Sequence, residues 1–329
     1  MDRFFNERRL LIAAFSMFLG CSSSNNSSNQ PDPVSYYIAT SGNITVTSDG
    51  GSSFEFLTGT PSAIVYSVYV SSTGTIYAGT GGGLGISTDD GSTFTAKTTA
   101  NGLPNDVIND LAEDSTGRLF IGTGGGLAIS TDGGSTFSVK TTADGLGSNN
   151  ILAVFVDNDN KVYVGTIAGL SISTNNGGTF SNKTTAQGLG DDNVSDVHVN
   201  SSGVIFAATV GGVSISTDAG ATFTNKTTAD GLPVNATATI FSDGNNVYAG
   251  NTSGLAISAN GGISFTTKTT ADGLGSNTIE AISKDGDNLL VVTGNGAVGG
   301  LSISTNGGTS FTNYNTGWTS FSPHSIYVR

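Results

Sequence analysis

An eight-residue stretch that returns seven times constrains the fold of this chain more than any other feature. Its clearest copy spans residues 130–137 and reads Ser-Thr-Asp-Gly-Gly-Ser-Thr-Phe. The closing aromatic residues of the copies are Phe54, Phe94, Phe137, Phe180, Phe223, Phe265 and Phe311. They are 40, 43, 43, 43, 42 and 46 residues apart. A period of roughly 40–45 residues with four strand-like runs per period is typical of a propeller blade. The sequence therefore predicts a β-propeller.

The fourth repeat shows how one blade is built. Residues 150–157 are mostly apolar, 161–166 are β-branched and aromatic, 170–174 alternate apolar and polar, and 179–185 form the last run. Such alternation predicts half-buried strands, and the Asn- and Gly-rich pieces between the runs predict turns. No long segment after the first twenty residues has the 3.6-residue apolar period, so we expect almost no helix.

The two ends of the repeat region complement each other. Residues 35–60 hold only three strand-like runs, and the missing innermost strand is found at residues 325–329. Pairing of the two ends would close a ring and remove exposed sheet edges. We therefore predict an all-β fold over residues 35–329, a seven-bladed β-propeller of four-stranded antiparallel blades whose first blade is closed by the C-terminal strand. An open solenoid is the alternative, but it would not explain the complementary ends.

The first residues predict export. Residues 1–9 carry three arginines and residues 10–19 are almost wholly apolar, which is the pattern of a signal peptide over residues 1–20. The apolar run is about half the length that a membrane-spanning helix needs. Cys21 follows directly and is the single cysteine of the chain. This arrangement resembles a bacterial lipoprotein signal, and the resemblance implies that Cys21 is lipidated. An ordinary signal peptide with an incidental cysteine is the alternative.

Residues 21–34 are rich in Ser and Asn and have little to bury, so we expect the lipidated cysteine to be followed by a flexible tether. The lipoprotein resemblance implies a place in the bacterial cell envelope, at the outer membrane or the cell surface, with the lipid as the only membrane contact. The formal net charge of −13 disfavours nucleic acid and anionic lipid headgroups as partners.

The repeated stretch resembles the Asp-box, also called the bacterial neuraminidase repeat. In that family the motif is a folding device on the hairpin between the third and fourth strands of a blade, away from the active site. The acidic position is filled here by Asp49, Asp89, Asp132, Asn175, Asp218, Asn260 and Asn306. Asp and Asn share an oxygen that accepts backbone N–H bonds in a turn, but only Asp is a base or a strong metal ligand. The exchange therefore favours a structural turn clamp over catalysis or calcium binding.

The other half of the repeat resembles a second family. Residues 101–107 (Asn-Gly-Leu-Pro-Asn-Asp-Val) and 113–123 are similar to the propeller repeat of the periplasmic sensor regions of hybrid two-component regulators. That family usually has Trp where Phe120 stands.

An active site is harder to assemble. Sialidases, which carry Asp-boxes, bind the substrate carboxylate with three arginines, whereas only Arg118 and Arg329 follow the signal peptide here, so we expect no sialidase activity. A different glycosidase would need two carboxylates on one face. The acidic candidates include Asp106, Asp110, Glu113, Asp114, Asp144, Asp191, Asp192, Asp230, Asp272 and Glu280. Of these, the pair Asp191 and Asp192 breaks the repeat most clearly.

Three further features draw attention. The stretch 293–300, which contains Asn295, is three residues longer than its counterparts, and insertions in repeats map to loops. Trp318 either fills an apolar slot or offers a stacking surface for a sugar. His198 falls in an inner-strand column and is expected to pack or to line the channel. That column is expected to comprise Tyr69, Ala112, Phe155, His198, Ile240, Ile282 and Tyr327.

These observations lead to one main hypothesis. We expect a non-enzymatic, envelope-anchored lipoprotein that binds an unidentified protein or glycan, or acts as a scaffold, through one face of the propeller. The candidate ligand-face residues are Asp191, Asp192, Asn295 and Trp318. A glycosidase or polysaccharide lyase that uses acidic loop residues is the alternative, and a purely structural surface layer is a third possibility. No cofactor is expected, and no metal site is expected because no Cys or His cluster has metal-ligand spacing.

Overall fold

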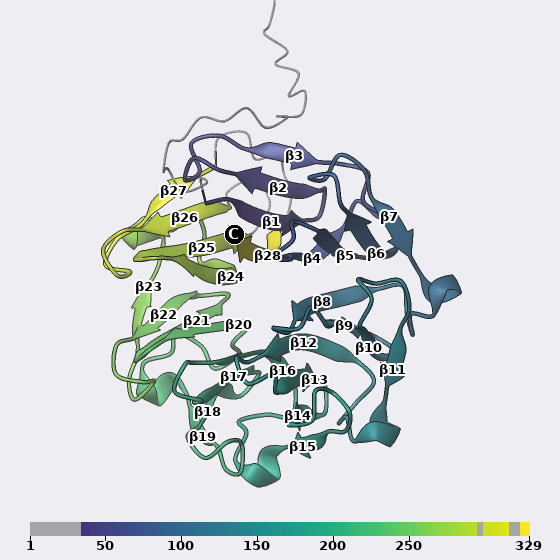
Figure 1. The fold of residues 1–329 in the computed structure, drawn as a ribbon. Coiled ribbons are helices and arrows are strands. Elements are labelled where there is room, and N and C mark those ends of the chain that lie inside the picture. Colours follow the sequence, from purple (N-terminus) through teal and green to yellow (C-terminus); the bar gives the residue numbers. More distant parts are fainter. Residues whose placement is uncertain (1–33, 295–298, 316–322) are drawn as a thin grey trace, which may run out of the picture. The chain divides into compact units, whose positions relative to one another are not determined.

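The computed structural model describes residues 34–294, 299–315 and 323–329. Cys21, the predicted signal peptide and almost all of the predicted tether lie outside this part of the chain, as do Asn295 and Trp318. The described residues form seven four-stranded antiparallel sheets arranged as a propeller, as predicted (Figure 1). The innermost strands contact one another in a closed cycle around the central channel.

Each blade contributes one strand to each of four concentric positions. The innermost strands are β28 (Pro323–Val328), β4 (Val65–Val70), β8 (Ile108–Glu113), β12 (Ile151–Val156), β16 (Val194–Val199), β20 (Thr239–Asp243) and β24 (Thr278–Asp285). The second strands are β1 (Tyr36–Thr40), β5 (Ile76–Thr80), β9 (Leu119–Thr123), β13 (Val162–Thr166), β17 (Ile205–Thr209), β21 (Asn246–Asn251) and β25 (Asn288–Gly294).

The two outer positions are shorter and more exposed. The third strands are β2 (Ile44–Thr47), β6 (Gly83–Ser87), β10 (Gly126–Ser130), β14 (Gly169–Ser173), β18 (Gly212–Ser216), β22 (Gly254–Ser258) and β26 (Gly300–Ser304). The outermost strands are β3 (Glu55–Leu57), β7 (Thr95–Lys97), β11 (Ser138–Lys140), β15 (Ser181–Lys183), β19 (Thr224–Lys226), β23 (Thr266–Lys268) and β27 (Thr312–Tyr314).

The first blade is closed by the C-terminal strand, which confirms the prediction from the complementary ends. Strand β28 pairs with β1 in an antiparallel register that places Val328 opposite Tyr36. The backbones of Ser35 and Arg329 exchange two further hydrogen bonds of 2.7 and 3.0 Å. Because β28 also contacts β24 and β4, it is part of the closed inner cycle and not an appended strand.

The core lies between neighbouring blades. One cluster combines Phe120 and Leu127 of the third blade with Ile151, Val162 and Val164 of the fourth, all of them buried. Equivalent clusters fill the other junctions, so each sheet buries both faces against its neighbours. Removal of this apolar surface from water stabilises the ring at roughly 25 cal/mol per Å².

Short 3₁₀ turns join five blades to the next: η1 (Thr99–Asn101), η2 (Thr142–Asp144), η3 (Thr185–Gln187), η4 (Thr228–Asp230) and η5 (Thr270–Asp272). At η2, the Asp144 carboxylate accepts the Thr141 N–H, and the Asp144 carbonyl accepts the N–H of Phe180 in the next blade. Gly145 follows with φ 98°, and a Cβ there would lie 2.1 Å from the Phe180 carbonyl oxygen, so only glycine fits. Within the described ranges there is no helix of the length and apolarity needed to cross a membrane.

The Asp-box-like hairpins connect the third and outermost strands. In the hairpin between β10 and β11, Oδ1 of Asp132 accepts hydrogen bonds from the Ser130 hydroxyl (2.8 Å) and the Thr136 N–H (2.9 Å), and Oδ2 accepts from the Thr136 hydroxyl (2.6 Å). Asn175 keeps the same Oδ1 bonds and donates from Nδ2 to the Thr179 hydroxyl. The hydroxyl reverses its role, which explains why Asp and Asn exchange at this position.

These hairpins predict a specific acid sensitivity. The hydroxyl and N–H donors lower the pKa of Asp49, Asp89, Asp132 and Asp218 to about 2. The stability that their ionisation adds is present above the ordinary aspartate pKa near 4 and is lost as the pH falls through about 2. A variant with Asn at all four positions should therefore lose less stability than the parent chain between pH 4.5 and pH 2.5. Urea unfolding at both pH values measures this difference.

At pH 7 the same variant should fold normally, because three hairpins already carry Asn. Asp287→Asn, in an exposed turn outside the hairpins, is the control and should follow the parent. Equal losses for the parent and the fourfold variant would contradict the clamp interpretation.

Candidate functional site

A cavity of about 260 Å³ opens where the innermost strands begin, and we call this opening the channel mouth. Its lining comes from the innermost strands or the residues next to them in every blade. The turns that join the second strand of each blade to its third strand, which we call the 2–3 turns, lie at the same face, because each second strand runs antiparallel to its innermost neighbour. The Asp-box-like hairpins lie at the opposite end.

Backbone bulges form the rim of the mouth. In six blades an extra residue interrupts the pairing of the innermost strand, and in the remaining blade Ala238 directly precedes β20. A bulged residue has no ladder partner, so its side chain is redirected. The rim residues are Tyr66, Asn109, Leu152, Ser195, Ala238, Glu280 and His324, and all of them line the cavity.

The rim residues are seven different amino acids at one repeated position. Nearby, the last residue of the second strand or its equivalent hardly varies. It is Thr40, Thr80, Thr123, Thr166, Thr209, Asn251 or Thr293. The rim position therefore varies from blade to blade, while the residue that ends the second strand hardly does. This contrast indicates that the fold alone does not determine the rim side chains.

Two aspartates lie just below the rim, each directly after a bulge. Oδ1 of Asp110 accepts the Leu111 N–H (2.8 Å) and the Ser67 hydroxyl (3.0 Å), and Oδ2 accepts the Val154 N–H of the next blade (2.8 Å). Asp110 therefore joins three consecutive blades. Burial raises its pKa to about 6, although the three donors oppose that shift.

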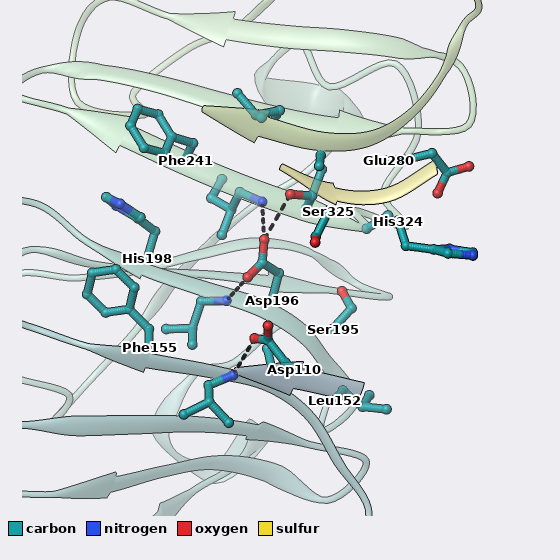
Figure 2. A pocket seen from close by; sticks show the side chains of 18 of the residues that line it. Asp110, Leu152, Phe155, Ser195, Asp196, His198, Phe241, Glu280, His324 and Ser325 are labelled. Carbon is teal, nitrogen blue, oxygen red and sulfur yellow. Dashed lines mark hydrogen bonds between the residues drawn. The ribbon is translucent and has the colours of Figure 1, made fainter. Parts of the chain in front are cut away.

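Asp196 repeats this arrangement two blades further on. Oδ1 accepts the Val197 N–H (2.7 Å), while Oδ2 accepts the Thr239 hydroxyl (2.9 Å) and the Ile240 N–H (2.8 Å) (Figure 2). Burial, with a smaller repulsion from Asp110, raises the pKa of Asp196 to about 7. Both carboxylates thus tie blades together, and each already accepts three hydrogen bonds.

Aromatic rings form the floor of the cavity. His198 lies between Phe155 and Phe241, with ring centroids 4.7 Å from each, and Figure 2 shows the three rings on the side away from Glu280. Nδ1 of His198 is 2.8 Å from the Ser242 hydroxyl. Burial lowers the pKa of His198 to about 4, so its ring is neutral at pH 7.

The residues at the floor correct the predicted inner-strand column, which contained Ile240 and Ile282. Phe241 pairs with Tyr248 just as His198 pairs with Phe206, so Phe241 and not Ile240 occupies this column. In the next blade Ser283 replaces the expected Ile282. Phe241 and Tyr248, like Ser283 and Leu290, are seven positions apart, whereas His198 and Phe206 are eight apart, so an alignment made from the following strand is shifted by one residue.

Two rim residues, His324 and Glu280, carry ionisable groups at the mouth. Nε2 of His324 is buried and lacks a hydrogen-bond partner in the described part of the chain, although the ring packs against Tyr66 at 5.4 Å. Glu280 lies over Gly294, and burial raises the pKa of its carboxyl group. Among the described residues no lysine or arginine lines the cavity, so the mouth is acidic.

The predicted pair Asp191 and Asp192 lies outside this lining. Asp192 Oδ1 accepts the Thr185 N–H, and aspartate or asparagine makes the same bond in the other linked blades. Asp191 Oδ1 accepts the Asn193 N–H, as Asn105 Oδ1 does for Val107. Both therefore occupy repeated turn positions and do not break the repeat. Whether they contact a ligand stays a prediction.

Sequence reasoning did not single out the channel carboxylates. Asp110 and Glu280 were only members of the acidic set, and Asp196 was not among the candidates. The available signal was a carboxylate in the first half of a predicted inner strand, as in β8 (INDLAE) and β16 (VSDVHV). Among the described residues, no three His, Cys, Asp or Glu side chains are grouped so as to hold a metal ion.

Comparison with known proteins identifies the repeat type. A family model described as two component regulator propeller matches residues 102–125 and 145–168, which bears out the second of the two repeat resemblances. The Asp-box and lipoprotein resemblances stay predictions. A search of curated proteins finds no match.

Several solved structures share the fold. The extracellular domain of a hybrid two component system, BT3049 from B. thetaiotaomicron, has 18% identity and a TM-score of 0.61, over 88% of this chain and 46% of that one. The Niastella koreensis GH74 enzyme has 22% identity and a TM-score of 0.59, over 78% and 46%. YCF48 bound to D1 peptide has 13% identity and a TM-score of 0.58, over 79% and 85%. The chain spans less than half of the first two proteins, and at these identities the likeness concerns the fold alone.

Proposed function

We propose that this chain is a non-enzymatic binding module of the bacterial cell envelope and that its ligand docks at the channel mouth. The observation that carries this proposal is the rim, where the repeat presents seven different side chains around one cavity. A ring of identical side chains would suit a structural plug. A ring of different ones suits an asymmetric ligand, which is what a protein segment or a glycan offers.

The alternative, hydrolysis or elimination by a carboxylate pair, has one observation in its favour. Asp110 and Asp196 share the cavity and have pKa values of about 6 and 7, which is the range of a general acid. Both carboxylates are nevertheless held by backbone N–H groups of two blades, which suits a structural role. The binding role therefore has the stronger support.

The envelope location rests on two supports. The first is the predicted signal peptide with Cys21 at its end. The second is that BT3049 of B. thetaiotaomicron, which shares the fold, is described as an extracellular domain. We propose that the lipid holds the propeller at the outer membrane or the cell surface.

Affinity capture with residues 22–329, which contain every described strand, tests the binding role. Native envelope proteins and a glycan array are offered to the parent chain and to Tyr66→Ala/Glu280→Ala. The matched control is Phe56→Ala/Glu55→Ala, which makes the same kind of change on the exposed outermost strand β3. We expect the mouth variant to bind the captured ligand at least about tenfold more weakly, because two central contacts are lost.

The control should bind like the parent. If the mouth variant and the control both bind the ligand as the parent does, the binding surface lies elsewhere. Turnover of a captured polysaccharide that is lost in Asp110→Asn/Asp196→Asn, while that variant melts like the parent, would favour the enzyme alternative.

A further inference from the structure

The charge at the channel mouth points to the class of ligand, an inference that rests on the proposed function. Three carboxylates, Asp110, Asp196 and Glu280, line one cavity, and no lysine or arginine in the described ranges lines it. Lys284 is engaged by Asp243, at the far end of the neighbouring inner strand. A half-enclosed group of like charges with low-dielectric walls creates a potential that favours a cation.

The cavity also has room for the cation and acceptors for it. A carboxylate offers about four acceptor sites, and the hydrogen bonds described above use three at Asp110 and three at Asp196. The Glu280 carboxylate accepts no hydrogen bond from the part of the chain that the structure describes. An ammonium group has three donors, which matches these free sites.

The cavity is deep enough to admit the flexible alkyl part of a long side chain. Along β16, the rim residue Ser195 and the floor residue His198 are three positions apart, or about 10 Å at the rise of a strand. A four-carbon side chain that enters beside the apolar rim residues Leu152 and Ala238 would bring its charge to the aspartate layer. The Phe155 and Phe241 rings below would face the same cation.

Exposed apolar side chains lie at the same face of the propeller in four consecutive blades. Ile64 and Val107 directly precede β4 and β8, and Ile167 and Val210 lie in the 2–3 turns of neighbouring blades. They are 39%, 38%, 47% and 51% exposed, respectively. A small diffusible amine or an amino sugar would leave these residues uncovered, whereas the apolar residues of a polypeptide would cover them.

We propose that the channel mouth binds a partner polypeptide by taking up one of its primary ammonium groups, while apolar residues beside that group cover Ile64, Val107, Ile167 and Val210. The ammonium comes from a lysine side chain or from a chain N-terminus. Both have the same charge and donors, and separate probes distinguish them.

The pH dependence of binding follows from the groups that face the cavity: Asp110, Asp196, Glu280, His198, His324 and Tyr66. Burial raises the pKa values of the three carboxyl groups and lowers those of both histidines. Asp110 and Asp196, with pKa values of about 6 and 7, gain charge as the pH rises from 5 to 8, and His198, with a pKa of about 4, stays neutral over that range. Affinity for an ammonium should therefore increase with pH.

The test is an NMR titration of residues 22–329 with three peptides at pH 7, where both a lysine side chain and most of a free N-terminus are charged. The first is acetyl-Gly-Ile-Lys-Ile-Gly-amide, the second carries Nε-acetyl-lysine instead, and the third has a free N-terminus and no lysine. We expect the first or the third to shift resonances of the mouth and the second to bind at least about tenfold more weakly. Glu280→Gln should weaken the ammonium peptide about tenfold, and the same change at Glu55, on β3, should not.

Equal affinity for the lysine and acetyl-lysine peptides would overturn the inference. So would equal losses for the changes at Glu280 and Glu55, since these would indicate unspecific attraction, and so would the absence of binding by all three peptides. If the captured ligand of the previous experiment still depends on Tyr66 and Glu280, the proposed function stands and only the ammonium class is wrong. If that capture fails as well, both are wrong.

Discussion

A chain that ends at residue 322 is expected to lose cooperative folding. Without β28 the first blade keeps only three strands, and β1 is left with an unpaired edge. The contacts of β28 with β24 and β4 also disappear, so the cycle of inner strands opens. An opened ring exposes core from two junctions and a sheet edge that promotes aggregation. Circular dichroism melts and urea titrations should show no transition like that of the full chain.

A circular permutant is the control for this truncation. It consists of residues 323–329, a short Asn-Gly linker and residues 34–315. The hydrogen bonds between Ser35 and Arg329 show that β28 and β1 can be joined as a hairpin. The permutant should regain a cooperative transition. Normal melting of the truncated chain would show that closure by β28 is dispensable.

Replacement of Asp196 by alanine should have a large effect on the stability of the ring. The change leaves the N–H groups of Val197 and Ile240 without their acceptor at a junction between blades. A buried donor without a partner costs about 1–3 kcal/mol, so we expect the free energy of unfolding to fall by about 3 kcal/mol. Urea unfolding at pH 7 measures this change.

Two further variants make the result interpretable. Asp287→Ala, in an exposed turn, should leave the stability unchanged. Asp196→Asn removes the titration: the folded pKa of about 7 lies above the ordinary value near 4, so the parent loses stability as the pH rises through 7. The Asn variant should show a flatter profile between pH 5 and pH 8. A stability of Asp196→Ala equal to that of the parent would contradict the junction role.

The fold could be predicted from the sequence because the same signals return in every copy. The spacing of the closing aromatics set the blade count, and the incomplete first repeat with residues 325–329 predicted the closure. Each blade makes the same turns with the same residue types. Errors in one copy, such as the place given to Ile240, did not affect the architecture.

The candidate site was less accessible to this reasoning. The bulges at Asn109 and Ser195 show only in the pairing between strands, and nothing in residue type announces them. The sequence drew attention to adjacent acidic residues, and Asp191 and Asp192 proved to be turn acceptors. In the sequence, Asp196 is one acidic residue among many. It becomes part of the candidate site only in the folded ring, which brings its carboxylate near that of Asp110. Cys21, Asn295 and Trp318 lie outside the described residues and stay predictions.

At the bulged rim, ligand recognition and closure of the ring depend largely on different residues, whereas most binding sites use the same residues for recognition and stability. Rim side chains sit where the ladder is interrupted, while the residues that hold the blades together, such as Asp110 and Asp196, lie one position further along. Substitutions at Tyr66 or Ala238 can therefore alter what is recognised with little effect on closure of the ring. Relatives with this repeat could acquire new ligands through single substitutions at rim positions such as these, whereas Asn109 and Ser195 also donate hydrogen bonds to the next blade and are less free to change.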